Sequence, residues 1–146
     1  MWLLRMAKNA SAGYTLSQCV TCETGYTPFN IGDSKKCYKS FGRKRLNLAN
    51  SICVKEDATL PLPKNSKENT DVYNLLVKIR QYSNDRLVLD LTDVQNEGSF
   101  VSSNGQKQNF FNFDKFNFKN NEKRDYVAME YNGVWWHHEG MILHMM

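Results

Sequence analysis

Apolar residues recur at helical spacing in two segments of the first half of the chain, and this pattern predicts two helices. The first segment runs from Arg45 to Asp57. Its apolar face carries Leu48, Ala49, Ile52 and Cys53. The second segment begins at Asn65 or Ser66, either of which can cap a helix. Its stripe has the i, i+3, i+4, i+7 spacing of a core-facing helix and consists of Val72, Leu75, Leu76 and Ile79.

Shorter apolar runs between turn residues follow in the second half of the chain and favour strands. One predicted strand covers Leu87 to Leu91, and another covers Phe100 to Ser102. A closing hairpin is predicted around Asn132-Gly133, because an Asn-Gly pair tolerates the positive φ angles of a tight turn. An earlier hairpin is predicted over residues 22–41. Two helices followed by several short strands indicate the α+β class.

Composition and charge limit the classes of protein to which the chain can belong. The sequence has 146 residues, enough for one domain with a buried core, and is 41% apolar and 23% charged. The net charge of +4 is scattered instead of lying along one helix, so no nucleic-acid partner is expected. The apolar runs fall short of the roughly 18 residues that a membrane-spanning helix needs. Residues 1–21 form a polar lead-in without periodic apolar pattern.

The four cysteines indicate an oxidising compartment. They are Cys19, Cys22, Cys37 and Cys53. A Cys-x-x-Cys pair can hold zinc or carry redox chemistry, but zinc needs a second pair of ligands at matching spacing, and a redox motif is expected beside a βαβ pattern. The sequence has neither, so a disulfide framework is expected. Three pairings of four cysteines are possible, and they stay open here.

No arrangement of side chains in the sequence indicates catalysis. A serine–histidine–acid order, a glycine-rich phosphate loop and a pair of carboxylates are all missing, so the chain is not expected to be an enzyme. His137 and His138 are adjacent on a predicted strand. Neighbouring strand residues point to opposite faces, so these two histidines cannot ligate one metal. We expect both to be exposed on the hairpin.

The order of several short motifs is more specific than any one of them. A cysteine hairpin and a helix ending in Cys53 precede Ala58-Thr59-Leu60 and the second helix. The later motifs are Val88-Leu89-Asp90-Leu91-Thr92-Asp93, Glu97-Gly98-Ser99-Phe100, Asn104-Gly105, Phe111-Asn112-Phe113 and Asn132-Gly133-Val134-Trp135. This order resembles that of C-type lectin-like domains over about residues 22–140. The resemblance implies an α+β fold in which two helices flank short antiparallel sheets with a long loop region.

The resemblance also divides the chain. Residues 22–146 are expected to form the C-type lectin-like domain, either complete or truncated at its C-terminal end. Cys22 and Cys37 correspond to the disulfide of the extra hairpin in long-form members. Residues 1–21 resemble the tail of a growth-factor-receptor-type cysteine-rich repeat.

Several positions depart from the family pattern. Tyr126 and Gly140 replace two cysteines that pair with each other in the family, so both halves of that disulfide are missing together. Cys53 normally pairs with a cysteine at the end of the domain; here it is either a buried thiol or a sign that the C-terminus is missing. Asp90 and Ser102 stand at family glycine and tryptophan positions, so we expect the core to pack differently.

The residues that hold calcium in sugar-binding members are also changed. Calcium takes six to eight oxygen ligands. One family triplet falls near Asn117-Phe118-Lys119, which lacks a proline and adds a lysine, and the other reads Trp135-Trp136-His137, without its Asn and Asp. Glu122 and Asp125 remain but supply too few oxygens. We therefore expect no metal and no cofactor.

These observations predict an extracellular or cell-surface recognition module, part of a longer chain, that binds a protein or a glycan without calcium. Trp135 is expected in the core and Trp136 on the surface. The predicted ligand-binding residues are Asn117, Phe118, Glu122, Trp136 and His137. Two alternatives stay open: a structural domain within a larger cysteine-rich extracellular protein, and a residual calcium-dependent carbohydrate-binding lectin.

Overall fold

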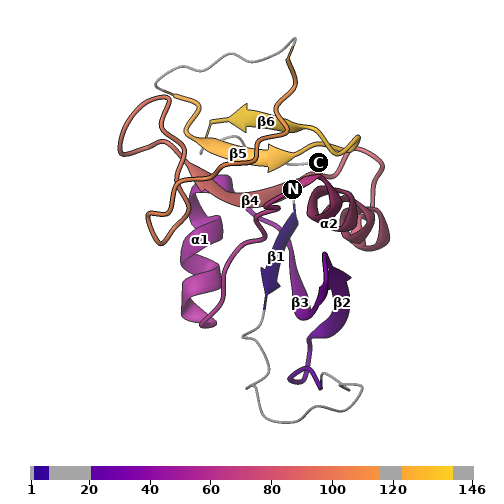
Figure 1. Ribbon diagram of the computed structural model, residues 1–146. Coiled ribbons are helices and arrows are strands. Elements are labelled where there is room, and N and C mark those ends of the chain that lie inside the picture. The colour runs from indigo at the N-terminus through magenta and orange to yellow at the C-terminus, as the bar shows by residue number, and fades with distance from the viewer. Residues whose placement is uncertain (1, 7–20, 116–122, 140–146) are drawn as a thin grey trace.

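The computed structural model describes residues 2–6, 21–115 and 123–139, which form two helices and six strands (Figure 1). The elements in chain order are β1 (Trp2–Met6), β2 (Thr27–Ile31), β3 (Ser34–Arg43), α1 (Leu46–Lys55), α2 (Ser66–Ile79), β4 (Leu87–Thr92), β5 (Tyr126–Met129) and β6 (Trp135–His138). The predicted α+β class and both predicted helices are confirmed, but Leu48, predicted on the apolar face of the first helix, is 47% exposed, and Leu46 is buried instead.

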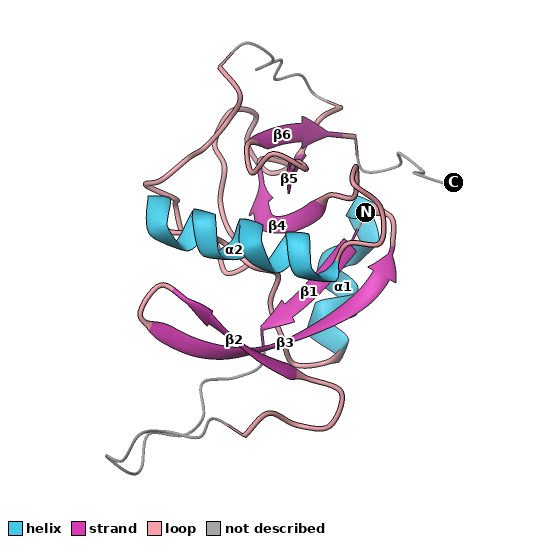
Figure 2. Ribbon diagram, turned by 90° about the vertical axis from the view of Figure 1, so that its right-hand side faces the viewer, coloured by secondary structure: helices cyan, strands magenta, loops and turns pink. Residues whose placement is uncertain are grey.

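The described strands form one sheet in the order β2-β3-β1-β4-β5-β6. β1 pairs with β4 in parallel, and the other pairings are antiparallel. In Figure 2, α2 crosses the middle of the molecule, with β4, β5 and β6 on one side and the β2–β3 hairpin on the other. The sheet therefore has two ends, β2 and β6, and α2 runs between them.

β1 differs from the sequence-based expectation. Trp2–Met6 lies in the segment interpreted as a lead-in, yet it pairs with β3, with Arg5 opposite Lys39 and Met6 opposite Tyr38. The apolar run at its start is three residues long, too short to indicate a strand by itself. Residues 7–20, with Cys19, lie outside the described residues. The boundary of the domain and the resemblance of its first residues to a cysteine-rich repeat stay predictions.

The two helices cover opposite faces of the central strands. Successive strand residues point to alternate faces. Leu87 and Leu89 pack with the α2 residues Val72, Leu75 and Leu76. Val88 instead packs with Leu46, Ala49 and Cys53 of α1. Cys53 is fully buried in this second cluster.

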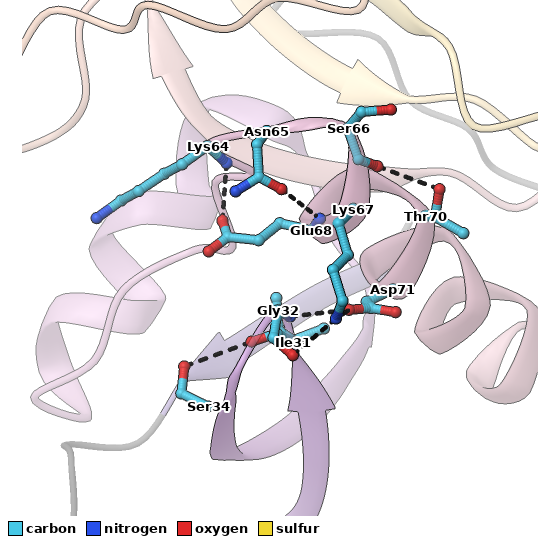
Figure 3. A network of polar contacts seen from close by, with 10 residues as sticks. All are labelled: Ile31, Gly32, Ser34, Lys64, Asn65, Ser66, Lys67, Glu68, Thr70 and Asp71. Carbon is cyan, nitrogen blue, oxygen red and sulfur yellow. Dashed lines mark hydrogen bonds and ion pairs between the residues drawn. The ribbon is translucent and has the colours of Figure 1, made fainter.

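The β2–β3 hairpin is held by a disulfide within its own segment and by contacts of its turn with α2. A disulfide joins Cys22 to Cys37, so the pairing implied by the family resemblance is present. Its turn lies against α2 (Figure 3): the Gly32 N–H donates to Asp71 Oδ2 at 2.8 Å, and Lys67 Nζ donates to the Gly32 carbonyl at 2.9 Å. Gly32 has a φ of 59°, and a Cβ there would lie 3.1 Å from Glu68 Cγ. Glycine therefore suits this turn.

The segment Phe100–Ser102 is not a strand, contrary to prediction. Val101 forms only isolated bridges, to Thr92 and Lys107. The surrounding residues close turns, which leaves no neighbour for a longer ladder. Within the part of the chain that the structure describes, neither helix is long and apolar enough to cross a bilayer.

Candidate functional site

The β5–β6 hairpin is fixed to α2 through one buried tryptophan. Trp135 is fully buried, as predicted, and its Nε1 donates to Asn69 Oδ1 at 2.7 Å. Asn69 Nδ2 donates to the Gly133 carbonyl in the hairpin turn at 3.2 Å, and Asn112 Nδ2 donates to the same carbonyl at 2.9 Å. The sequence analysis missed Asn69. Its position three residues before Val72, on the apolar stripe of the helix, was the available signal.

A cluster of aromatic rings fills the space beside β6. The His137 ring lies 4.4 Å from the Phe113 ring and 4.8 Å from the Phe100 ring, centroid to centroid. Phe113 contacts Trp135 edge-on at 5.9 Å, and Phe111 stacks on Phe113 at 5.7 Å. The Phe111 side chain is 44% exposed. The aromatic cluster therefore extends from the core to the surface.

The prediction that both hairpin histidines are exposed is wrong, because each has a buried environment of its own. His137 and His138 are each 6% exposed. His137 lies within the aromatic cluster. On the opposite face, His138 Nε2 lies 2.7 Å from Glu130 Oε1, and Arg86 Nε donates to the other oxygen of Glu130 at 2.6 Å. Their burial means that neither ring is a free surface contact.

Trp136 is also less exposed than predicted. Its side chain is half-buried, and its Nε1 is buried without a hydrogen-bond partner among the described residues. It lies opposite Ala128 in the β5–β6 register. One part of the indole therefore packs on the sheet, while the rest reaches the surface.

Three carboxylates gather close to the same hairpin. Asp93 follows β4, Glu97 lies in the next turn, and Asp125 precedes β5. One oxygen of each lies within 4.8 Å of the others. Asp93 is buried and accepts a hydrogen bond from the Gly98 N–H at 2.8 Å, whereas Glu97 is exposed. This acidic cluster can supply part of the oxygen set that a hard cation such as calcium needs.

Sequence analysis considered only Asp125 of this acidic cluster. The available signal for the other two was their spacing, because Asp93 and Glu97 are four residues apart in the sequence. Asp93 and Asp125 also meet through the backbone, because the Asp93 N–H donates to the Asp125 carbonyl at 3.2 Å. The start of the acidic loop and the start of the last hairpin are therefore held together.

The charge of Asp93 acts on both Asp125 and His137. Burial, and then the Asp93 charge, raise the pKa of Asp125 above its usual value. Burial lowers the pKa of His137, against the opposing effect of Asp93. The lowered pKa keeps His137 neutral at pH 7. A positive charge placed between Asp93 and Asp125 would reduce the repulsion between these two carboxylates.

The predicted ligand-binding residues are only partly described. Trp136 and His137 are neighbours on β6. Asn117, Phe118 and Glu122 lie outside the described residues, so their place at this surface stays a prediction. Two exposed apolar residues missed by the sequence analysis lie on the loops that adjoin the hairpin: Val94 beside the acidic cluster and Tyr131 in the β5–β6 turn.

Two curated proteins are similar to part of this chain. The chain is 35% identical over 82 residues to a C-type lectin domain family 3 member A homolog from Xenopus laevis, covering 56% of this chain and 42% of that protein. It is 33% identical over 88 residues to a tetranectin-like protein from Carcharhinus perezii, covering 56% and 49%. The matched region spans less than half the length of these curated relatives. No family model matches the chain.

Solved structures show the same fold at low sequence identity. C-type lectin CEL-I from Cucumaria echinata has a TM-score of 0.65 at 22% identity, covering 82% of this chain and 89% of that one. The carbohydrate-recognition domain of mouse scavenger receptor C-type lectin has a TM-score of 0.65 at 19% identity, covering 82% and 87%. Cow CD23, solved in the presence of an oligosaccharide, has a TM-score of 0.58 at 21% identity, covering 80% and 84%. The chain therefore has the C-type lectin-like fold.

Proposed function

We propose that this domain is an extracellular recognition module that binds a glycan or a protein partner at the surface formed by the β5–β6 hairpin and the adjoining loops, without a calcium ion bridging the ligand. The observation that carries the proposal is the chemistry of β6. Where a calcium-bridged ligand needs oxygen donors, the strand presents the half-buried Trp136 and the buried His137.

The aromatic cluster supports a binding mode based on ring contacts. Aromatic side chains offer apolar faces that stack against sugar rings or fill pockets in a protein partner. Phe111 reaches the surface from this cluster, and Tyr131 is exposed in the adjacent turn. Because Asn69 and Asn112 both hold the Gly133 carbonyl, the hairpin is fixed before any ligand binds.

The test is a glycan array with purified domain, run in parallel with calcium and with EDTA. The expected result is binding that EDTA leaves unchanged and that Trp136→Ala weakens at least tenfold. Leu48→Ala, an exposed change on the outer face of α1, serves as the matched control. Unchanged affinity in folded Trp136→Ala contradicts the proposed surface, and folded protein that binds no glycan shifts the search to protein partners.

A second candidate function is favoured by the acidic cluster. In this version Asp93, Glu97 and Asp125 hold a calcium ion that supports the adjoining loop, and ligand binding depends on that ion. Isothermal titration with calcium chloride distinguishes the two. Saturable binding that Asp93→Asn abolishes, together with loss of glycan binding in EDTA, favours the second candidate. Absence of any calcium binding by the folded domain removes it.

A further inference from the structure

A pocket of about 180 Å³ opens at a different part of the molecule from the hairpin. It lies between α2, β4, the loop 59–64 and the turn 102–106. The apolar part of its lining comes from Ile31, Leu60, Leu62 and Val72. No residue of β5 or β6 lines it, so a ligand here does not share contacts with the proposed hairpin surface.

One short side chain, Ser102, explains why this space is hollow, and Asp90 adds a polar group to its wall. Ser102 and Asp90 both line the pocket. They are the two positions at which the family resemblance implies a tryptophan and a glycine. Ser102 is only 8% exposed, so a short side chain occupies a buried position. Protein interiors are normally close-packed, and here the neighbouring side chains leave the volume unfilled.

Hydrogen bonds hold the pocket walls in place. The Asp90 N–H donates to the Pro61 carbonyl at 2.9 Å, which ties β4 to the first loop. Gln108 Nε2 donates to the Pro63 carbonyl at 2.6 Å, which ties the later loop to the same wall. Within the turn 102–106, the Ser102 N–H donates to the Gln106 carbonyl at 3.0 Å. The pocket is therefore shaped before a ligand enters.

Two ammonium groups of the pocket lining form no hydrogen bond or ion pair within the described part of the chain. Lys36 is half-buried in the wall and makes no hydrogen bond or ion pair with any residue that the structure describes. Burial lowers its pKa, with Glu68 opposing this effect and Lys64 adding to it. Lys64 is exposed and also lines the pocket. An ammonium group in such a place gains free energy from an anionic partner.

The carboxylates of the pocket are already engaged. Asp90 accepts from the Ser103 N–H and from the Ser103 hydroxyl, each at 3.0 Å. Glu68 accepts from the Lys64 N–H at 2.8 Å (Figure 3). The formal charges of the lining balance, with two lysines and two carboxylates, but both carboxylates already accept hydrogen bonds while neither ammonium group forms an ion pair within the described residues. An anionic group of a ligand can therefore pair with the lysines. Uncharged groups that can pair with hydroxyls complete the lining: Thr59, Ser102, Asn104 and Gln106.

We propose that this pocket binds a single small ring that bears one carboxylate and several hydroxyls, as a hexuronic acid does. The carboxylate lies between Lys36 and Lys64, the hydroxyls pair with Asn104 and Gln106, and the C–H face of the ring packs on Leu60. The proposal rests on the pocket alone and does not depend on the function proposed for the hairpin.

The test is a titration of the labelled domain, followed by two-dimensional NMR, with sodium glucuronate, glucose and acetate as separate probes. Glucuronate is expected to shift the amide signals of the turn 102–106 and to bind at least tenfold more tightly than either other probe. A further titration uses an oligosaccharide that ends in glucuronic acid. Tighter binding of the oligosaccharide identifies a glycan as the source, and equal binding identifies the free acid. Glucuronate that binds no better than glucose and acetate overturns the proposal.

Matched variants keep the test independent of folding. Lys36→Gln is expected to weaken glucuronate binding about tenfold. Lys35→Gln removes the same charge from the preceding residue, which is exposed and outside the lining, and should leave binding unchanged. Ser102→Trp fills the space and should abolish binding if the variant folds. Trp136→Ala should not alter glucuronate binding, which separates this site from the hairpin surface. Equal binding by Lys36→Gln and wild type overturns the proposal.

Discussion

The two ends of the sheet are attached to α2 by different chemistry. At the β6 end, a fully buried Trp135 packs in the core and its Nε1 bonds to a buried Asn69. At the β2 end, the Gly32 N–H donates to the partly exposed Asp71, and a disulfide joins the segment before β2 to β3. Both ends bury apolar residues in one core cluster, which contains Trp135 at the first end and Ile31 and Tyr38 at the second. The second end adds a covalent link and polar contacts to this burial. We therefore expect the β6 end to unfold only with the core, and the β2 end to depend on oxidation.

Trp135→Ala is the change expected to have the largest effect. It leaves a cavity at a fully buried position and removes the donor for Asn69, so the free energy of unfolding should fall by about 3–5 kcal/mol. Urea denaturation followed by circular dichroism measures it. Tyr131→Ala, on the exposed turn of the same hairpin, is the control and should lie within about 0.5 kcal/mol of wild type. A loss below 1 kcal/mol for Trp135→Ala would mean that the β6 end is not part of the cooperative core.

The double change Cys22→Ala and Cys37→Ala tests the other end. The two cysteines are 15 residues apart, and a loop of this length contributes about 3 kcal/mol when a disulfide closes it. Denaturation of the double variant and of wild type, each with and without dithiothreitol, gives the measurement. Reductant should destabilise wild type by a similar amount and leave the variant unchanged. If reduced wild type keeps its full stability, the β2 end does not rely on this covalent link.

Asp71→Ala separates the polar contacts of the β2 end from its disulfide. The change removes the acceptor for the Gly32 N–H and the partner of Lys67, and should cost about 1–2 kcal/mol. Hydrogen exchange at Gly32 should quicken more than the loss of global stability accounts for, because the turn is released locally. Asn74→Ala, an exposed change on the same helix, should leave that exchange unaltered. Unchanged protection at Gly32 in Asp71→Ala would show that this polar contact does not hold the turn.

Sequence patterns predicted the elements whose residues repeat at a regular local spacing or contain a recognisable turn. The stripe from Val72 to Ile79 predicted the helix and its core face. Of the two candidate caps, the structure uses Asn65, whose Oδ1 accepts from the Glu68 N–H. The Asn-Gly turn gave the last hairpin. Strand β1 was not predicted because it is stabilised by pairing with β3. The partners in β3 lie more than 30 residues further along the chain, so no local pattern indicates them.

The functional surface was harder to predict because burial is a tertiary property. A strand pattern places His137 and His138 on opposite faces but says nothing about what covers each face. Phe113 and Phe100 cover one ring and Glu130 the other. The acidic cluster was missed for the same reason, because only the fold brings Asp125 to Asp93.

His137 gives the smallest expected effect and the one most specific to the β6 end, because the histidines of the chain all lie at or after residue 137. Burial lowers its pKa below the ordinary value of about 6.5, so the unfolded chain binds a proton there more readily than the native domain does. This contribution to stability is complete above about pH 6.5 and is lost as the pH falls below it, with a slope of at most about 1.4 kcal/mol per pH unit. His137→Phe keeps a ring between Phe100 and Phe113 and should lower the dependence on pH between 7.5 and 5.5, as measured by urea denaturation. If the stability of this variant depends on pH as much as that of wild type, burial of a neutral His137 does not contribute to the stability of the β6 end. The contrast between the two ends would then be weaker.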